Sequence, residues 1–275
     1  MDEFAGRVAV VTGAGSGMGK AFAKRFAAEG MKVVVADIET DALARTVEEL
    51  RADGVATIGV PTDVSDVDAV RHLADLASEE FGDVHLLCNN AGVEGYLDGP
   101  VWEATAKDWR WTFGVNYWSV VYGLEAFVPR MLAHGQPAHV VNNVSMTAVI
   151  APGNLYGICK HAVLALTEVL ARDLRERDAR IGVTALCPGT IATNLFHGSR
   201  NRPEHLRNEH EIPQEGRELR DRMHARLAEG MSPAEVADKL VDAIRANALY
   251  LLTDHEWDEL IVDRHNAILA GVSQQ

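Results

Sequence analysis

The 275-residue chain has few cysteines, few aromatic residues and no excess of basic charge. Its three cysteines, Cys88, Cys159 and Cys187, each stand in an apolar run and show neither disulfide nor metal-ligand spacing. We therefore expect buried thiols in a reducing compartment and no bound metal. Aspartate and glutamate outnumber lysine and arginine by 40 to 26, for a net charge of −14. This balance argues against nucleic acid as a partner.

Long hydrophobic runs are also missing. No stretch approaches the ~20 apolar residues that span a bilayer, and residues 1–4 lack the basic and apolar regions of a signal peptide. We expect a cytoplasmic protein with no membrane partner. Hydrophobic residues make up 47% of the chain, which is ample for a sizeable core.

A glycine-rich turn follows the first apolar strand, at residues 7–12, and opens a helix. The turn has the spacing Thr-Gly-x-x-x-Gly-x-Gly, with Gly13, Gly17 and Gly19, and Met18 stands where the common G-x-G-x-x-G pattern has its last glycine. Such glycines let backbone N–H groups approach a pyrophosphate at a helix N-terminus. The strand, turn, helix and next strand form a βαβ unit.

Asp37 ends the second strand of this unit. A carboxylate there accepts hydrogen bonds from the ribose hydroxyls of NAD and repels a 2′-phosphate. Neither Ser16 in the turn nor Ile38 after the aspartate is basic, so NAD is favoured over NADP. Asp37 could also serve as an N-cap for the helix that begins near Glu39.

Alternating strand and helix patterns continue to the end of the chain. They predict a single α/β domain, residues 1–275, with a Rossmann-type doubly wound parallel sheet of about seven strands and helices on both faces. Ser65 is the expected N-cap of the helix that ends near residue 81, and one long helix is expected over residues 107–133. Residues 194–230 are rich in charge and histidine, which predicts either a substrate lid or a solvated surface insertion. The expected strands are 7–12, 33–36, 55–60, 84–88, 140–144, 181–186 and 249–252.

Tyr156 and Lys160 lie four residues apart in an apolar-periodic helix, so they share one face. An ammonium beside a phenol lowers the pKa of the phenol, which would suit Tyr156 to general acid/base work. Ser145, at the end of the preceding strand, could donate a hydrogen bond to a substrate oxygen that gains negative charge.

Taken together, these motifs resemble the short-chain dehydrogenase/reductase family over residues 7–271. The resemblance implies a catalytic set of Asn116, Ser145, Tyr156 and Lys160, with Tyr156 as the acid/base. It implies that Asn116 holds a water linked to Lys160, although Asn116 could instead mend a helix irregularity. It also implies a homo-oligomer, a tetramer or dimer, packed through helices near residues 109–130 and 155–174. The implied cofactor contacts are Gly13, Ser16, Gly17, Met18, Gly19, Asp37, Ile38, Asp63, Val64, Asn90, Ala91, Gly92, Tyr156, Lys160, Pro188, Gly189, Ile191 and Thr193.

The serine departs from the family pattern. The family usually places it about two residues farther from the tyrosine, a distance that lands on Asn143. Ser145 is preferred because Asn143 falls inside the predicted strand. Among the implied cofactor contacts, Asp63 could be only an N-cap, and Thr193 could be a cap for the segment that follows it.

The predicted function is oxidoreduction: hydride transfer between NAD and a secondary alcohol or ketone. The alternatives are an NADP-dependent carbonyl reductase and a non-catalytic NAD-binding sensor or scaffold. The residues expected to line the substrate pocket are partly apolar and partly polar, which predicts a medium-sized, partly hydrophobic substrate. The expected lining residues are Glu94, Tyr96, Met146, Leu155, Asn194, Phe196 and His197.

Overall fold

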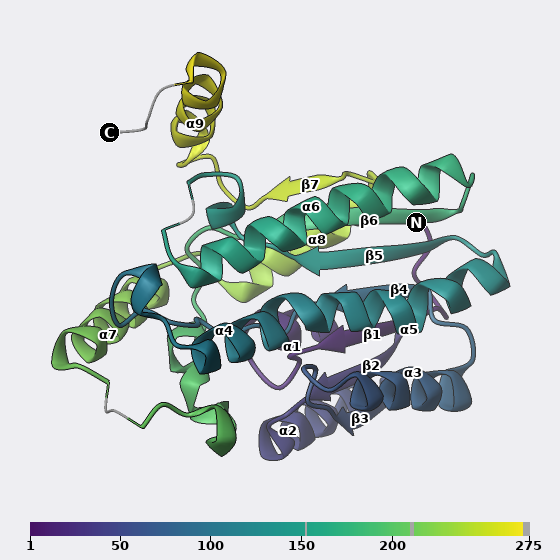
Figure 1. Ribbon diagram of the computed structural model, residues 1–275. Coiled ribbons are helices and arrows are strands. Elements are labelled where there is room, and N and C mark those ends of the chain that lie inside the picture. Colours follow the sequence, from purple (N-terminus) through teal and green to yellow (C-terminus); the bar gives the residue numbers. More distant parts are fainter. Residues whose placement is uncertain (152, 210–211, 272–275) are drawn as a thin grey trace.

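The computed structural model describes residues 1–151, 153–209 and 212–271 and contains a seven-stranded sheet (Figure 1). The strands are β1 Val8–Thr12, β2 Lys32–Asp37, β3 Thr57–Pro61, β4 Leu86–Asn89, β5 Ala138–Asn143, β6 Ile181–Cys187 and β7 Tyr250–Leu252. Every neighbouring pair is parallel, in the order β3-β2-β1-β4-β5-β6-β7. This confirms the predicted doubly wound α/β fold.

Helices cover both faces of the sheet (Figure 1). The helices are α1 Gly17–Ala28, α2 Thr40–Ala52, α3 Val67–Phe81, α4 Ala106–Phe113, α5 Ser119–His134, α6 Leu155–Glu176, α7 Gln214–Ala228, α8 Pro233–Arg245 and α9 Asp258–Ala270. One core layer joins α1, α2 and α8 to the sheet through residues such as Phe22, Leu43 and Leu240. The other joins α3, α5 and α6 to the opposite face through residues such as Leu73, Phe127 and Leu174. The strands are apolar on both faces because each face is covered.

The order of the strands reverses between β1 and β4, which are neighbours in the sheet although β2 and β3 separate them in the chain. The loops after β1 and β4 therefore diverge to opposite sides and leave a crevice at the carboxyl edge, where ligands bind in such sheets. The three cysteines are free and buried, as expected.

Several local predictions are wrong, and among them the strand expected at 84–88 begins at Leu86. Asp66, not Ser65, caps α3: its carboxylate accepts from the N–H of Asp68 at 2.9 Å, while the Ser65 hydroxyl donates to Asp63 Oδ1. The strand expected at 55–60 begins at residue 57, because the N–H of Val55 donates to Leu50 O at the end of α2. The long helix over 107–133 is interrupted by a π-helical turn, η2 Gly114–Trp118, between α4 and α5.

Two parts of the chain extend beyond the two helical layers (Figure 1). Residues 194–209 and 212–230 contain two 3-10 helices, η4 Leu195–Asn201 and η5 Glu204–Leu206, and α7. Helix α9 stands away from the body, and none of its residues is buried. None of the helices in the described part of the chain is long and apolar enough to cross a membrane.

Candidate active site

The glycine turn after β1 packs directly against the end of β4. The side-chain amide of Asn90 donates to Thr12 O at 2.8 Å and to Gly13 O at 3.3 Å. A Cβ on Gly19 would lie only 2.1 Å from Gly13 O, and Gly13 has a positive φ of 64°. Any side chain at residue 19 would therefore push the turn away from the helix that it opens. Glycine at this place leaves the backbone N–H groups at the start of α1 open to a ligand.

Asp37 is fixed at the end of β2 by two backbone donors. Its Oδ2 accepts from the N–H of Gly15 at 2.8 Å, and its Oδ1 accepts from the N–H of Glu39 at 2.9 Å. The second bond fits the alternative in which Asp37 shapes the start of α2, but Glu39 is the capping position of that helix. The carboxylate also lines the cleft, so the local role and ligand recognition are compatible.

The loops after β3 and β6 complete this end of the cleft. Asp63 Oδ1 accepts from both the N–H and the hydroxyl of Ser65. Thr193, after β6, approaches the glycine turn closely: a Cβ on Gly17 would lie 3.4 Å from Thr193 Cγ2. Thr193 does not cap the following 3-10 helix, whose capping position is Asn194.

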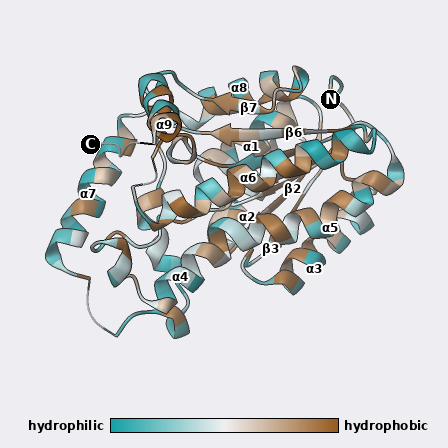
Figure 2. Cartoon of the chain, turned by 45° about the horizontal axis from the view of Figure 1, so that its top comes forward, coloured by the Kyte–Doolittle hydropathy of each residue, from teal (hydrophilic) through white to brown (hydrophobic). Residues whose placement is uncertain are grey.

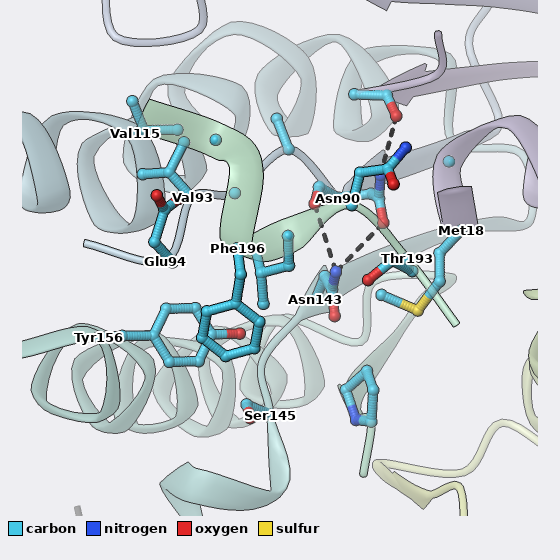
Figure 3. A pocket seen from close by; sticks show the side chains of 18 of the residues that line it. Met18, Asn90, Val93, Glu94, Val115, Asn143, Ser145, Tyr156, Thr193 and Phe196 are labelled. Carbon is cyan, nitrogen blue, oxygen red and sulfur yellow. Dashed lines mark hydrogen bonds between the residues drawn. The ribbon is translucent and has the colours of Figure 1, made fainter. Parts of the chain in front are cut away.

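Tyr156, Lys160 and Ser145 all line the same cleft. The Nζ of Lys160 donates to Asn143 O at 2.7 Å and lies 5.5 Å from the centroid of the Tyr156 ring. Figure 3 shows the Tyr156 side chain reaching from α6 toward the labelled residues Ser145 and Phe196. Asn143 belongs to β5, as expected, and its amide donates to Asn90 Oδ1 at 3.1 Å.

Burial dominates the electrostatics of the pair. It raises the pKa of Tyr156 to about 12, an effect that the neighbouring Ser145 side chain opposes. It lowers the pKa of Lys160 to about 8, because the interior disfavours the ammonium. The prediction that Lys160 leaves the phenol with a lowered pKa is therefore wrong in direction. The phenol keeps its proton through the neutral range.

Asn116 lies behind the cleft, within the π-helical turn. Its side chain donates to Val93 O and accepts from the N–H of Val93, both at 3.0 Å. These bonds tie the π-helical turn to the loop after β4 and not to the backbone of the helix itself, so they do not mend a helix irregularity in the way the alternative supposed. A Cβ on Gly92 would lie 3.0 Å from Asn116 Oδ1 and 3.8 Å from Lys160 Nζ, so Asn116 is close to the lysine.

The cleft gathers nearly all of the expected residues. Of the candidate catalytic and cofactor-binding residues, only Gly17 and Asn116 do not line it. Glu94, Met146, Asn194 and Phe196 line it as expected, but Tyr96 and His197 line a neighbouring cavity and Leu155 is core. Figure 3 shows expected cofactor contacts, Met18 and Thr193, on one side of the pocket, and Val93 and Glu94 on the other side.

Several lining residues had no signal in the sequence. They come from helices and loops whose position depends on packing, and they carry no motif. They are Glu39, Val93, Trp111, Val115, Ile150, Arg200, Asn201, Met223, Arg226 and Trp257.

Comparison with known proteins agrees with this geometry. Residues 7–204 match the family described as short chain dehydrogenase. The chain belongs to the short-chain dehydrogenase family. It is 44% identical over 194 residues to the 1-deoxy-11-beta-hydroxypentalenate dehydrogenase of Streptomyces exfoliatus, with 70% of each chain covered. It is 33% identical over 282 residues to the C alpha-dehydrogenase of a Sphingobium species, with 99% of this chain and 88% of that one covered.

A solved short-chain dehydrogenase/reductase from Burkholderia phymatum, in complex with NAD, has a TM-score of 0.96 and 42% identity to this chain. The match covers 100% of this chain and 98% of that one. This short-chain dehydrogenase is thus an oxidoreductase of hydroxyl or keto groups that uses a nicotinamide cofactor. The glycine turn, which a Cβ would fill, and the fixed Asp37 carboxylate fit such a dinucleotide.

Proposed function

We propose that this short-chain dehydrogenase interconverts a secondary alcohol and its ketone with NAD, and that Tyr156 exchanges the proton. One observation carries the proposal: Tyr156, Ser145 and Lys160 line the same cleft as the glycine turn and Asp37. A binding protein would need the nucleotide end of this cleft but not the phenol of Tyr156 and the buried lysine beside it. The bound cofactor supplies the hydride chemistry.

Tyr156 gives its proton to the carbonyl oxygen in reduction and takes it from the hydroxyl in oxidation. The pKa near 12 supports a phenol that is protonated and ready to donate at neutral pH. Ser145 donates a hydrogen bond to the same substrate oxygen. Lys160 is anchored on Asn143 O, and it places a positive charge beside the phenol whenever it is protonated. Asn116 positions the segment of Val93 and, in this proposal, the water linked to Lys160.

NAD is proposed over NADP because of Asp37. Its two carboxylate oxygens are held by backbone N–H groups at the rim of the cleft, so the charge cannot swing away from an incoming 2′-phosphate. The relative from Burkholderia phymatum holds NAD, which supports the same preference. We propose that the other predicted cofactor residues that line the cleft contact this cofactor, and that Gly17 acts through the shape of the turn.

The substrate end of the cleft supports a medium-sized, partly hydrophobic substrate. The cleft combines apolar walls with a few polar groups. Trp111, Val115, Ile150 and Phe196 supply apolar surface, and Glu94 supplies a carboxyl. The curated relatives named above are dehydrogenases of hydroxylated compounds or of an alpha carbon, in keeping with oxidation at a carbon centre.

We also propose a single-domain homo-oligomer in which residues 194–230 act as a lid. Apolar side chains are exposed on α5, on β7 and above all on α9, where Leu269 is 86% exposed. Figure 2 shows hydrophobic residues along α9, the helix that stands away from the body in Figure 1. Exposed apolar surface of this extent supports contact with a second copy of the chain.

The test is the Tyr156→Phe variant, which removes the phenolic oxygen and keeps the ring. We expect it to abolish oxidation of secondary alcohols while NADH binding, followed by nicotinamide fluorescence, stays intact. Retained turnover would sink the proposed role of Tyr156. Tight NADH binding without turnover of any alcohol or ketone by the wild-type protein would instead favour the sensor, and tighter binding of NADPH than NADH would overturn the cofactor preference.

A further inference from the structure

Residues 199–201, at the end of η4, bridge two loops that lie far apart in the sequence. The N–H of Ser199 donates to Glu94 Oε1 at 3.1 Å, in the segment after β4. The next residue, Arg200, forms an ion pair with Glu39, after β2, and Asn201 Nδ2 donates to the same Glu39 Oε1 at 2.7 Å. We call residues 199–201 the strap.

The strap is fitted closely at its Glu94 end. Gly198 is buried, and a Cβ there would lie 2.4 Å from Glu94 Oε2 and 3.2 Å from Val93 Cγ1. Only glycine lets the backbone approach the carboxyl this closely. The guanidinium of Arg200 is held within η4 as well, since its Nη1 donates to His197 O at 2.6 Å. The strap is therefore closely packed against the loop that carries Glu94.

The other end of the strap lies at the nucleotide end of the cleft. Glu39 follows Asp37 by two residues, and its N–H donates to Asp37 Oδ1. Asp37, Glu39, Arg200 and Asn201 all line the cleft that also holds the glycine turn. Two carboxylates so close together would repel an anionic dinucleotide, and Arg200 offsets one of these charges.

From these contacts we infer that Glu39 is a positioning residue that latches the strap over the nucleotide end of the cleft and thereby slows release of the cofactor. The inference rests on the proposed NAD-dependent function. Glu39, Arg200 and Asn201 form part of the cleft wall at this end, so breaking the contacts of Arg200 and Asn201 with Glu39 should widen the exit for a bound dinucleotide. Glu39 needs no contact with the cofactor for this role, since it acts through Arg200 and Asn201.

The test measures NADH dissociation by stopped-flow fluorescence in Glu39→Gln, which removes the charge and nearly keeps the shape. An exposed ion pair contributes modestly, so we expect the dissociation rate to rise about twofold to fivefold, with a smaller change in the association rate. Arg200→Gln should give the same rise, and the double variant should show less than the product of the two effects. The matched control is Glu29→Gln, which breaks ion pairs with Arg25 and Arg245 away from the cleft.

Salt provides a second readout. The Arg200 and Glu39 side chains are 43% and 33% exposed, so added salt screens their attraction. The dissociation rate should rise more steeply with salt in the wild-type protein and in Glu29→Gln than in Glu39→Gln. A merely structural role for Glu39 would leave this slope unchanged.

The outcomes separate the latch from the proposed function. Unchanged NADH dissociation in both Glu39→Gln and Arg200→Gln, with normal turnover, would overturn the latch and leave the proposed function in place. Failure of the wild-type protein to bind NADH would overturn both.

Discussion

Lys160 is a functional group that should cost the folded protein stability. Its side chain is only 2% exposed, and burial lowers its pKa from 10.5 to about 8. A shift of this size corresponds to about 3 kcal/mol of penalty for carrying the ammonium at neutral pH. The Lys160→Met variant removes this penalty but also removes the donor to Asn143 O, and an unpaired carbonyl costs about 1–3 kcal/mol. At about pH 7 the two effects should nearly cancel.

The pH dependence of the free energy of unfolding separates the penalty of the buried ammonium from the loss of the hydrogen bond. Because the folded pKa lies below the unfolded value, the unfolded state binds more protons between about pH 8 and 10.5, and stability rises with pH across that window. From about pH 7 to pH 10 the wild-type protein should therefore gain about 2 kcal/mol relative to Lys160→Met. Below the folded pKa the penalty is fully present in the wild-type protein.

The assay is urea unfolding, followed by circular dichroism, of both proteins across this pH range. Lys239→Met, which removes an exposed lysine from α8, is the matched control and should show no such relative change. A wild-type stability that stays parallel to that of Lys160→Met from pH 7 to pH 10 would refute the reasoning, because it would mean that Lys160 is not held as a desolvated ammonium.

Four further outcomes are expected. Gly19→Ala should abolish NADH binding in a titration while circular dichroism stays native, because the added Cβ would meet Gly13 O at 2.1 Å; unchanged affinity would contradict the packing. Glu94→Gln should raise the melting temperature more at pH 8 than at pH 4: burial raises the pKa of this carboxyl, so its contribution to stability falls as pH rises above its unfolded value. An equal gain at both pH values would count against a buried acid. Asp37→Asn should raise NADPH affinity relative to NADH, since the repelling charge is gone; an unchanged ratio of dissociation constants would argue against Asp37 as the discriminator. Alcohol oxidation should accelerate as pH rises above neutral, because burial raises the pKa of Tyr156 to about 12 and the proton-accepting phenolate is scarce below it; a flat rate profile would contradict this.

Local patterns were enough for the fold and for much of the site. Strands such as 33–36 are apolar on both faces, and that pattern exists only where helices cover a sheet on each side. The glycines near residue 13 and the acid at residue 37 follow strand ends, and parallel strands bring their carboxyl ends to one edge. The spacing of Tyr156 and Lys160 follows from the helical period alone. For these residues the position in the sequence was enough to predict the position in the fold, because helices and strands have regular geometry.

The structure decided what depends on distant contacts. The pKa of Tyr156 moves opposite to the prediction because burial, which no spacing reveals, raises it and outweighs the opposing Ser145 side chain. Asp66 rather than Ser65 caps α3 because the serine hydroxyl is engaged by Asp63. The contacts of Arg200 and Asn201 with Glu39 join residues more than 160 positions apart, and no periodicity links them. The sequence by itself thus determined the elements, their order and the motif residues, since these rest on local stereochemistry. Only the tertiary structure decided burial, charge balance and the closing contacts of the cleft, since these arise from packing between segments that are remote in the chain.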